Sequence, residues 1–124
     1  MARILIVLGL GIGLVGVNPA LAGDAKAGQT VFKAKCAICH AVTVKAPVGI
    51  GPTMAGVMGR KAGSRPGYAF SPAMKSSGLT WTAETLKLYL ANPQGTVRGN
   101  KMPYAGMPAA ADRDNVAAYL ATLR

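Results

Sequence analysis

The feature that most restricts the fold is a stretch of 39 residues, Val42 to Thr80, which contains seven glycines and four prolines. This composition predicts turns, with room for only short pieces of helix. Ser71-Pro72 can open one such piece and Gly78 can end it, because proline suits the first helical position and glycine the position after the last. A loop this long does not normally pack by itself within a compact domain. We therefore expect it to pack against something that the chain does not encode, such as a large apolar cofactor.

The N-terminus, residues 1–22, has the pattern of a secretory signal peptide. A short positive start, Met1-Ala2-Arg3, precedes an uncharged apolar run of 14 residues, and Ala20-Leu21-Ala22 offers small residues to a signal peptidase. As a helix the run would rise only about 21 Å, short of the roughly 30 Å of a bilayer core. We expect cleavage after Ala22 and export to the periplasm of a bacterium. An anchor that stays uncleaved is the alternative.

Length and charge narrow the classes of function. The 124 residues include 14 Lys and Arg against four Asp and Glu, a formal net charge of +10. An exported domain this basic is expected to meet acidic surfaces, with an association that weakens as salt rises. Nucleic acid fits poorly, because export removes that ligand and no aromatic residues alternate with the basic ones. We expect one domain, a monomer, without stable insertion in a membrane once the signal is cleaved.

Three segments have the periodicity of helices. Asp24 can cap a first helix that runs to about Lys35. Thr82 can cap a second, which ends at Asn92-Pro93, and Asp112 or a residue beside it can start a third. The residues expected to share an apolar face are Gly28 and Phe32 in the first helix, Leu86, Tyr89 and Leu90 in the second, and Val116, Tyr119, Leu120 and Leu123 in the third. The pairing of Gly28 with Phe32 predicts that another helix, plausibly the last, crosses the first at close range.

Both cysteines and the single histidine of the chain lie in Cys36-Ala37-Ile38-Cys39-His40. A redox dithiol would need a thioredoxin-like α/β unit, which the pattern lacks. Structural zinc would need a fourth ligand, and a disulfide here would close a very small loop and stabilise little. Covalent attachment of haem uses all three residues. If the segment is helical, Cys36 and Cys39 face the same side and can form thioethers with one porphyrin, while His40 ligates the iron.

The second axial ligand must come from another residue type, because the chain has no second histidine. The methionines beyond the signal are Met54, Met58, Met74, Met102 and Met107. Met54 and Met58 lie four residues apart, a spacing more typical of core packing. Met102 lies in a turn-rich stretch, far enough from His40 along the chain to reach the opposite face of a haem. Met107 competes on the same grounds, so the residues alone leave the choice open.

Several stretches together resemble class I cytochromes c, the family of mitochondrial cytochrome c and its periplasmic relatives in bacteria. They are GDAKAGQTVFKAKCAICH, Gly51-Pro52, GRKAG, PGYAFSPAMKSSGLTW and GNKMPYAGM, in the order of the family. The resemblance covers essentially all of Gly23 to Arg124. It implies an all-α, single-domain fold wrapped around one haem c, with the first and last helices crossing. It also implies that Met102 is the second iron ligand and that Met107 packs in a loop.

The resemblance implies further roles around the haem. The Pro52 carbonyl would accept a hydrogen bond from the ring nitrogen of His40 that does not bind iron. Arg60 and the indole N–H of Trp81 would face a haem propionate, and Tyr89 would lie near the Met102 sulfur. Phe70 and Met74 depart from the family, which has tyrosine and asparagine there in its mitochondrial members. Both changes make the pocket less polar, so the reduction potential of the family does not transfer.

The function implied is one-electron transfer and not enzymatic catalysis. The resemblance implies an electron donor in a quinol–cytochrome c oxidoreductase complex and an acceptor in a terminal oxidase or a photosynthetic reaction centre. Because Lys35 precedes Cys36 and Lys101 precedes Met102, acidic docking surfaces are expected to bind near these two lysines. The patch could extend to Lys33, Lys61, Lys75 and Lys87. The alternative is a haem-based sensor or a peroxidase-like enzyme with a labile sixth ligand, although no second histidine offers acid–base chemistry.

Overall fold

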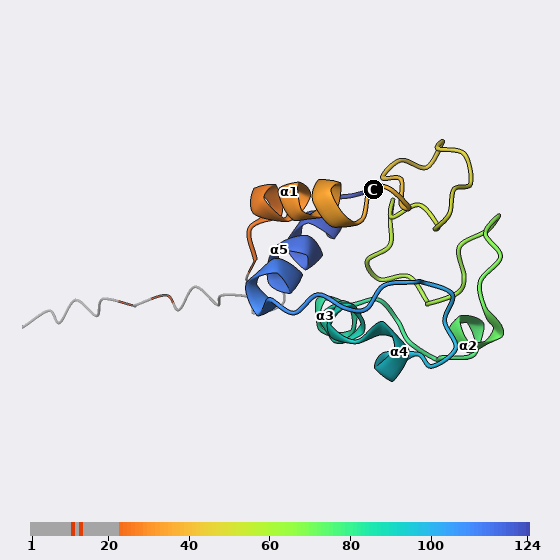
Figure 1. The fold of residues 1–124 in the computed structure, drawn as a ribbon. Helices are drawn as coiled ribbons and strands as arrows, with labels where there is room; N and C mark the ends of the chain where they lie inside the picture. Colours follow the sequence, from red (N-terminus) through yellow and green to blue (C-terminus); the bar gives the residue numbers. More distant parts are fainter. Residues whose placement is uncertain (1–10, 12, 14–22) are drawn as a thin grey trace, which may run out of the picture.

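The computed structural model describes Gly11, Gly13 and residues 23–124 (Figure 1). The expected signal peptide and its cleavage site therefore lie almost entirely outside the described residues. The helices are α1 (Ala25–Lys35), α2 (Pro72–Lys75), α3 (Ala83–Ala91), α4 (Pro93–Thr96) and α5 (Ala110–Leu120). Over residues 23–124 the only β-type pairing is one isolated antiparallel bridge, between Lys61 and Thr80. None of these helices combines the length and hydropathy that a bilayer crossing requires. The prediction of an all-α domain is confirmed.

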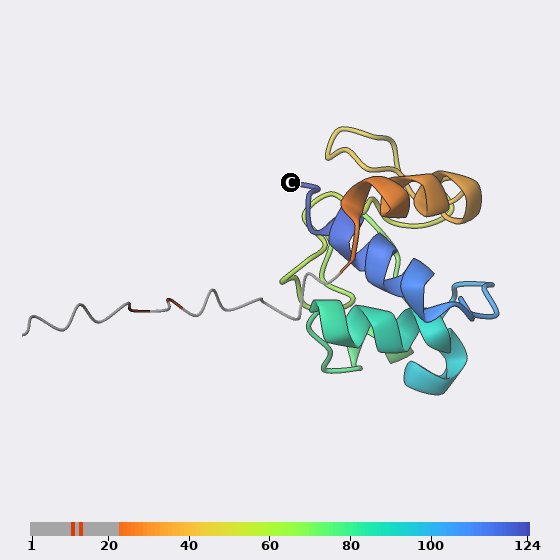
Figure 2. The same ribbon diagram turned by 90° about the vertical axis from the view of Figure 1, so that its left-hand side faces the viewer.

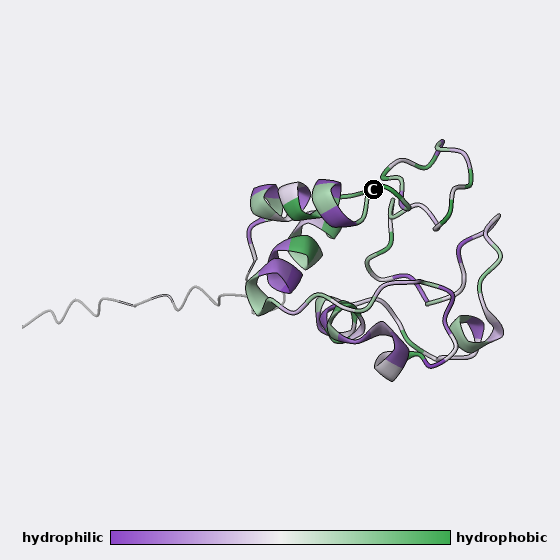
Figure 3. Ribbon diagram, in the orientation of Figure 1, coloured by the Kyte–Doolittle hydropathy of each residue, from purple (hydrophilic) through white to green (hydrophobic). Residues whose placement is uncertain are grey.

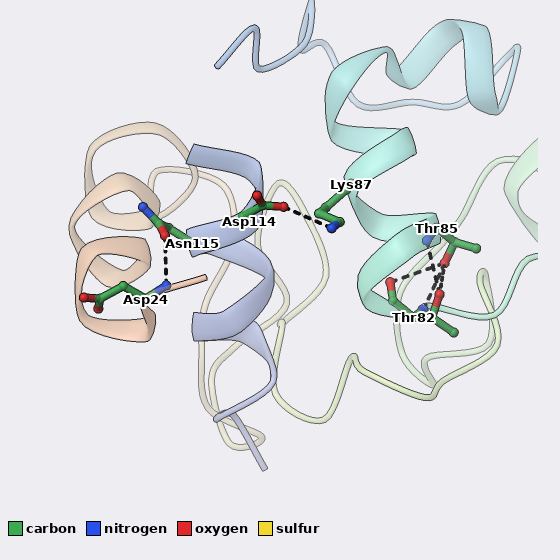
Figure 4. Close-up of polar contacts among 6 residues, drawn as sticks. All are labelled: Asp24, Thr82, Thr85, Lys87, Asp114 and Asn115. Carbon is green, nitrogen blue, oxygen red and sulfur yellow. Dashed lines mark hydrogen bonds and ion pairs between the residues drawn. The ribbon is translucent and has the colours of Figure 1, made fainter. Parts of the chain in front are cut away.

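Two helices begin where the capping residues predicted. The Asp24 side chain accepts hydrogen bonds from the backbone N–H groups of Lys26 and Ala27, at 2.8 and 3.0 Å, and α1 ends at Lys35. The Thr82 hydroxyl accepts from the Thr85 N–H at 3.1 Å, and the Thr85 side chain accepts from the Thr82 N–H at 2.9 Å (Figure 4). This reciprocal pair satisfies two N–H groups that the first turn of a helix leaves free.

The last helix starts two residues earlier than Asp112, at Ala110, and its N-cap residue Ala109 provides no side-chain cap. Asp112 lies instead in the first turn, where a carboxylate interacts favourably with the helix dipole. Arg113 donates from one guanidinium nitrogen to the carbonyls of Met107 and Pro108, at 2.6 and 2.9 Å. These bonds fix the entry of the chain into α5 without a capping side chain.

The short helices differ more from the prediction. α2 opens at Pro72 with Ser71 as its cap, as expected, but it ends at Lys75 instead of near Gly78. The Ser76 N–H and hydroxyl both bond to the Pro72 carbonyl, at 3.0 and 2.8 Å, which closes the helix after one turn. α4 was not predicted. The Asn92 side chain, which follows α3, accepts from the Gly95 N–H at 2.9 Å and starts this new turn of helix.

α1 and α5 cross at very short range (Figures 1 and 2). Gly28 is buried at the crossing, and a Cβ atom there would collide with the backbone carbonyl of Asn115. Beside it the rings of Phe32 and Tyr119 lie 5.4 Å apart, centroid to centroid. The Asp24 N–H donates to the Asn115 side chain at 2.9 Å (Figure 4). The predicted crossing of the first and last helices is therefore confirmed.

The core lies between α1, α3 and α5. The expected apolar faces are buried there, from Phe32 on α1, through Leu86, Tyr89 and Leu90 on α3, to Val116, Tyr119 and Leu120 on α5. Burying each of these large side chains stabilises the fold by about 1.5–3 kcal/mol. On the surface α3 is tied to α5 by an ion pair between Lys87 and Asp114, 3.0 Å long (Figure 4).

The long loop is helix-free from residue 36 to residue 71, opposite the crossing of α1 and α5 (Figure 1). It is ordered by single backbone hydrogen bonds between distant residues. The Gly51 N–H donates to Cys39 at 2.9 Å, and the Met54 N–H donates to Ala41 at 2.8 Å. Such isolated bonds hold the path of the loop but bury little apolar surface, so the loop needs another partner to pack on.

Candidate functional site

An apolar cavity of about 300 Å³ lies between the long loop, α3, α5 and the segment after α4. Every residue that the sequence predicted for the site lines this cavity: Cys36, Cys39, His40, Pro52, Arg60, Trp81, Tyr89 and Met102. These residues come from positions spread over residues 36–102. The fold therefore brings the predicted set together in one place.

α1 ends at Lys35, as predicted, and Cys36 to His40 forms tight turns, so the helical arrangement considered for the two cysteines does not occur. Cys36 is the C-cap of α1, and the N–H groups of Cys39 and His40 both bond to the Cys36 carbonyl at 3.0 Å. The bond from Cys39 spans three residues, as in a 3₁₀ turn, and tightens the end of the helix. Both thiols are free and face the cavity. Burial raises the pKa of the Cys36 thiol, against the opposing charge of Lys35.

His40 is held with one ring nitrogen engaged and the other free. Its Nδ1 lies 2.8 Å from the Pro52 carbonyl oxygen. A carbonyl only accepts, so Nδ1 carries the proton and Nε2 keeps its lone pair. Burial lowers the pKa of His40 below its ordinary value, and the bond to Pro52 offsets this only in part. The ring is therefore neutral at neutral pH, which is the form that ligates metals.

Gly51 makes this placement of the imidazole possible. A Cβ atom at Gly51 would lie 2.5 Å from Cε1 and 2.7 Å from Nδ1 of His40. No side chain fits in that space, so the backbone of Gly51 packs directly on the face of the ring. Together Gly51 and Pro52 fix the orientation of His40 from two directions.

Met102 is half-buried at the cavity wall, and its neighbours orient it. The Tyr89 hydroxyl lies 4.0 Å from the Met102 sulfur. Burial, with a smaller contribution from Tyr68, raises the pKa of Tyr89 to about 12, so its O–H remains available as a donor. The Met102 N–H donates to the Asn100 side-chain oxygen at 2.8 Å.

Asn100 is a positioning residue that the sequence reasoning missed. It is a polar side chain only 8% exposed. Its amide nitrogen donates to the carbonyls of Pro93 and Val97, at 3.0 and 2.9 Å, while its oxygen holds Met102. Its position two residues before Met102 was the available signal, because asparagine often bonds to the backbone two residues on. The amide thus ties the segment of Met102 to α4.

Some of the described methionines line the cavity and others do not. Met107 is 1% exposed, its N–H donates to the Leu90 carbonyl at 2.7 Å, and it does not line the cavity. Met58 does not line it either, whereas Met54, Met74 and Met102 do. Met54 and Met58 both pack against the core, as expected, and Met54 also lines the cavity. Among the described methionines the geometry leaves three that can present sulfur to a cavity ligand.

The residues expected near a polar group also line the cavity. Trp81 packs edge to face on Tyr89, with ring centroids 5.1 Å apart, and Arg60 is half-buried nearby. Phe70 and Met74 line the cavity as apolar side chains. Arg65, which the sequence reasoning passed over, also lines it and donates to the Ala55 carbonyl at 3.2 Å. No motif in the sequence marks Arg65.

The charges around the cavity have one sign. Its lining includes Lys35, Arg60, Lys61, Arg65 and Lys101, and no described aspartate or glutamate lines it. The Lys101 ammonium donates to the Ala69 carbonyl and lies 5.4 Å from the centre of the Tyr68 ring. Lys87, suggested as an extension of the basic patch, instead pairs with Asp114 and does not line the cavity.

A sequence model described as "Cytochrome c" matches residues 25–124. The chain belongs to the cytochrome c family. Cytochrome c2 of Rhodoblastus acidophilus is 50% identical over 103 residues, which are 83% of this chain and 95% of that relative. Cytochrome c2 of Rhodomicrobium vannielii is 52% identical over 101 residues, 82% of this chain and 80% of that relative.

A solved structure supports the same family assignment. Cytochrome cH from Methylobacterium extorquens is similar to this chain with a TM-score of 0.75 and 46% identity, over 81% of this chain and 99% of that one. The resemblance drawn from the motifs is thus confirmed. With it the chain is an electron-transfer protein of the mono-haem c type.

The described residues fit a covalently bound haem c. Two thiols, free of any disulfide, and an imidazole with a free Nε2 face the same apolar cavity, and three thioethers lie on its wall. Thiols, one neutral imidazole and a thioether are the donors that c-type haem uses.

Proposed function

We propose that this protein is a periplasmic one-electron carrier, cleaved after Ala22, whose single haem c is joined to Cys36 and Cys39. In this proposal His40 and Met102 are the axial ligands of the iron. The observation that carries it is the convergence of both thiols, the free Nε2 of His40 and the Met102 sulfur on one apolar cavity. Met102 is favoured over Met54 and Met74 because the Tyr89 hydroxyl lies 4.0 Å from its sulfur and Asn100 holds its backbone.

The side chains around the two ligands have separate tasks in this proposal. The Pro52 carbonyl accepts a hydrogen bond from the Nδ1–H of His40 and thereby makes the ring a stronger ligand. Tyr89 donates toward the Met102 sulfur, while Arg60 and the indole N–H of Trp81 face a propionate. Arg65, which also lines the cavity, adds a second cation for that carboxylate.

When bound, haem c supplies an iron that gains and loses one electron. With His40 and Met102 both holding the iron, the chain would leave no position on the metal for substrate. The apolar lining of the cavity would exclude water from the group. This arrangement supports outer-sphere transfer through the exposed side of the cavity and gives no support to a site for substrate chemistry.

The charge pattern supports docking to acidic redox partners. Lys35 and Lys101 are exposed, line the cavity and meet no carboxylate there. An acidic surface would be steered to this side quickly at low salt and more slowly at high salt. The proposed donor is a quinol–cytochrome c oxidoreductase complex, and the acceptor is a terminal oxidase or a photosynthetic reaction centre.

The test is made on the full chain, expressed in a bacterium that exports it and attaches haem. The intact mass of the purified protein should equal Gly23 to Arg124 plus one haem. The ferric form should show the weak charge-transfer band of iron bonded to sulfur. Met102→Ala should abolish this band, whereas Met54→Leu, Met74→Leu and Met107→Leu should keep it. Loss of the band in Met54→Leu or Met74→Leu, with Met102→Ala unaffected, would contradict the ligand assignment.

A further inference from the structure

Two arginine side chains of the long loop reach the same short stretch of backbone. The Arg65 guanidinium donates to the Ala55 carbonyl at 3.2 Å. A Cβ atom at the next residue, Gly56, would lie 3.5 Å from Nη2 of Arg60, so the end of that side chain lies beside it. Both arginines are half-buried and line the cavity. We call Arg60 and Arg65 the arginine pair. It gathers two positive charges at one part of the cavity lining.

The backbone around the arginine pair is fixed by hydrogen bonds. The Trp81 N–H donates to the Arg60 carbonyl at 2.9 Å, so these two residues lie side by side. Just before Arg65, the Ser64 hydroxyl donates to the Lys61 carbonyl at 2.5 Å and closes a turn. Hydrophilic and apolar stretches alternate along the long loop in Figure 3. Both arginines therefore start from fixed positions in a loop that is not polar throughout.

The arginine pair has no acidic partner in the described part of the chain. No described aspartate or glutamate lines the cavity, and the ion pair found in residues 23–124, between Lys87 and Asp114, lies elsewhere. Arg65 uses one guanidinium nitrogen on Ala55, which leaves further N–H donors for an anion. Because buried charges are costly unless they are paired, the arginine pair indicates an anionic group bound in the cavity.

Phe70 removes a hydrogen-bond donor from the same cavity. It lines the cavity and packs edge to face on Tyr68, with ring centroids 4.8 Å apart. Mitochondrial members of the family have tyrosine at this position, and phenylalanine has no hydroxyl to donate. Met74, also in the lining, is apolar as well. Neither side chain can hold a carboxylate, which leaves more of that task to the arginine pair and the indole N–H of Trp81.

Building on the haem-binding function proposed above, we propose that Arg65 replaces the donor that Phe70 lacks and holds a haem propionate as an ion pair. Arg65 is a positioning residue, since it acts on the iron only through this carboxylate. The negative charge of a carboxylate favours ferric iron, and a guanidinium bound to it offsets that charge where the dielectric constant is low. Arg65 therefore raises the reduction potential. A hydroxyl restored at position 70 should compensate for its loss.

The test is a double-mutant cycle on the holoprotein, with the reduction potential measured at neutral pH and fixed ionic strength. Arg65→Ala should lower the potential, and Arg65→Lys should lower it less because it keeps the charge. Phe70→Tyr should recover part of the loss in the Arg65→Ala protein, and it should raise the potential less when Arg65 is present. Arg98→Ala removes an exposed arginine outside the cavity and should leave the potential unchanged, since solvent and salt screen its charge.

Urea-induced unfolding of each variant separates this role from a purely structural one. Because Arg65 also bonds to Ala55, a structural role would lower the free energy of unfolding and leave the potential unchanged. That result would overturn the proposal. So would an equal shift of potential in Arg98→Ala, or effects of Arg65→Ala and Phe70→Tyr that simply add. If instead the unaltered protein is isolated without covalent haem, the proposed function itself is wrong.

Discussion

The crossing of α1 with α5 and the loop around the cavity are stabilised in different ways. At the crossing the chain is its own partner: Gly28 lies against the backbone of Asn115, and Phe32 lies against Tyr119. The loop from residue 36 to residue 71 has no helix and depends on isolated bonds such as Gly51 to Cys39. The first region is complete in the polypeptide alone. The second is built to pack on a group that the chain must acquire.

Removing that group is the sharpest way to test the difference. In a haem-free chain with Cys36→Ser and Cys39→Ser, we expect the cooperative fold to be lost. The apolar lining of the cavity would face water, and helices of 11 residues such as α1 and α5 are marginal on their own. Circular dichroism and the fluorescence of Trp81 during denaturant titration measure this. Cooperative unfolding with the stability of the holoprotein would contradict it.

The crossing of α1 with α5 should be sensitive to a substitution at Gly28. Gly28→Ala is expected to lower the free energy of unfolding of the holoprotein by about 2 kcal/mol or more, since the methyl group meets backbone atoms that cannot move aside. In an open helix the same change would instead stabilise by about 1 kcal/mol. Guanidinium-induced unfolding of the holoprotein measures whether Gly28→Ala lowers or raises the free energy of unfolding.

Gly49→Ala is the matched control in the loop. A Cβ atom at Gly49 would meet nothing closer than 3.6 Å. Its effect on the free energy of unfolding should stay within about 0.5 kcal/mol. If Gly28→Ala also stays within that range, the two helices do not depend on close backbone contact.

Asn100 offers a smaller and more local test on the loop side. Asn100→Ala leaves buried groups unsatisfied and should weaken the hold on Met102 by about 1–3 kcal/mol. The reduced holoprotein should then bind carbon monoxide detectably faster. Asn100→Asp keeps the acceptor for the Met102 N–H. Its rate of carbon monoxide binding should lie between the rates of Asn100→Ala and the unaltered protein. Ser76→Ala, which removes an exposed hydroxyl bond on α2, should leave binding unchanged. Equal behaviour of Asn100→Ala and the unaltered protein would exclude the positioning role.

The same contrast explains what the sequence could predict. α1 and α3 were located to the residue because Asp24 and Thr82 are strong caps followed by periodic apolar faces. α5 began earlier than expected because Arg113, and not a capping side chain, fixes its entry. α4 was missed because Asn92-Pro93 signals both the end of one helix and the start of another.

In the site, local motifs predicted the chemistry, but distant contacts decided the geometry. The cluster at Cys36 to His40 predicted haem attachment, and the longer motifs indicated the family. The residues alone could not separate Met102 from Met107, since both lie before a proline in the same turn-rich stretch. Burial separates them: Met107 is inside the core and away from the cavity. Asn100 acts through the carbonyls of Pro93 and Val97, contacts that no periodic pattern encodes.

The most direct measurement of the central claim is carbon monoxide binding to the reduced, unaltered holoprotein at neutral pH, followed by visible absorption. If His40 and Met102 fill both axial positions, the spectrum should stay unchanged on mixing, while Met102→Ala should bind carbon monoxide rapidly. Rapid, stoichiometric binding by the unaltered protein would mean that the sixth position is open or loosely held. The assignment as an electron carrier with two protein ligands would then be wrong.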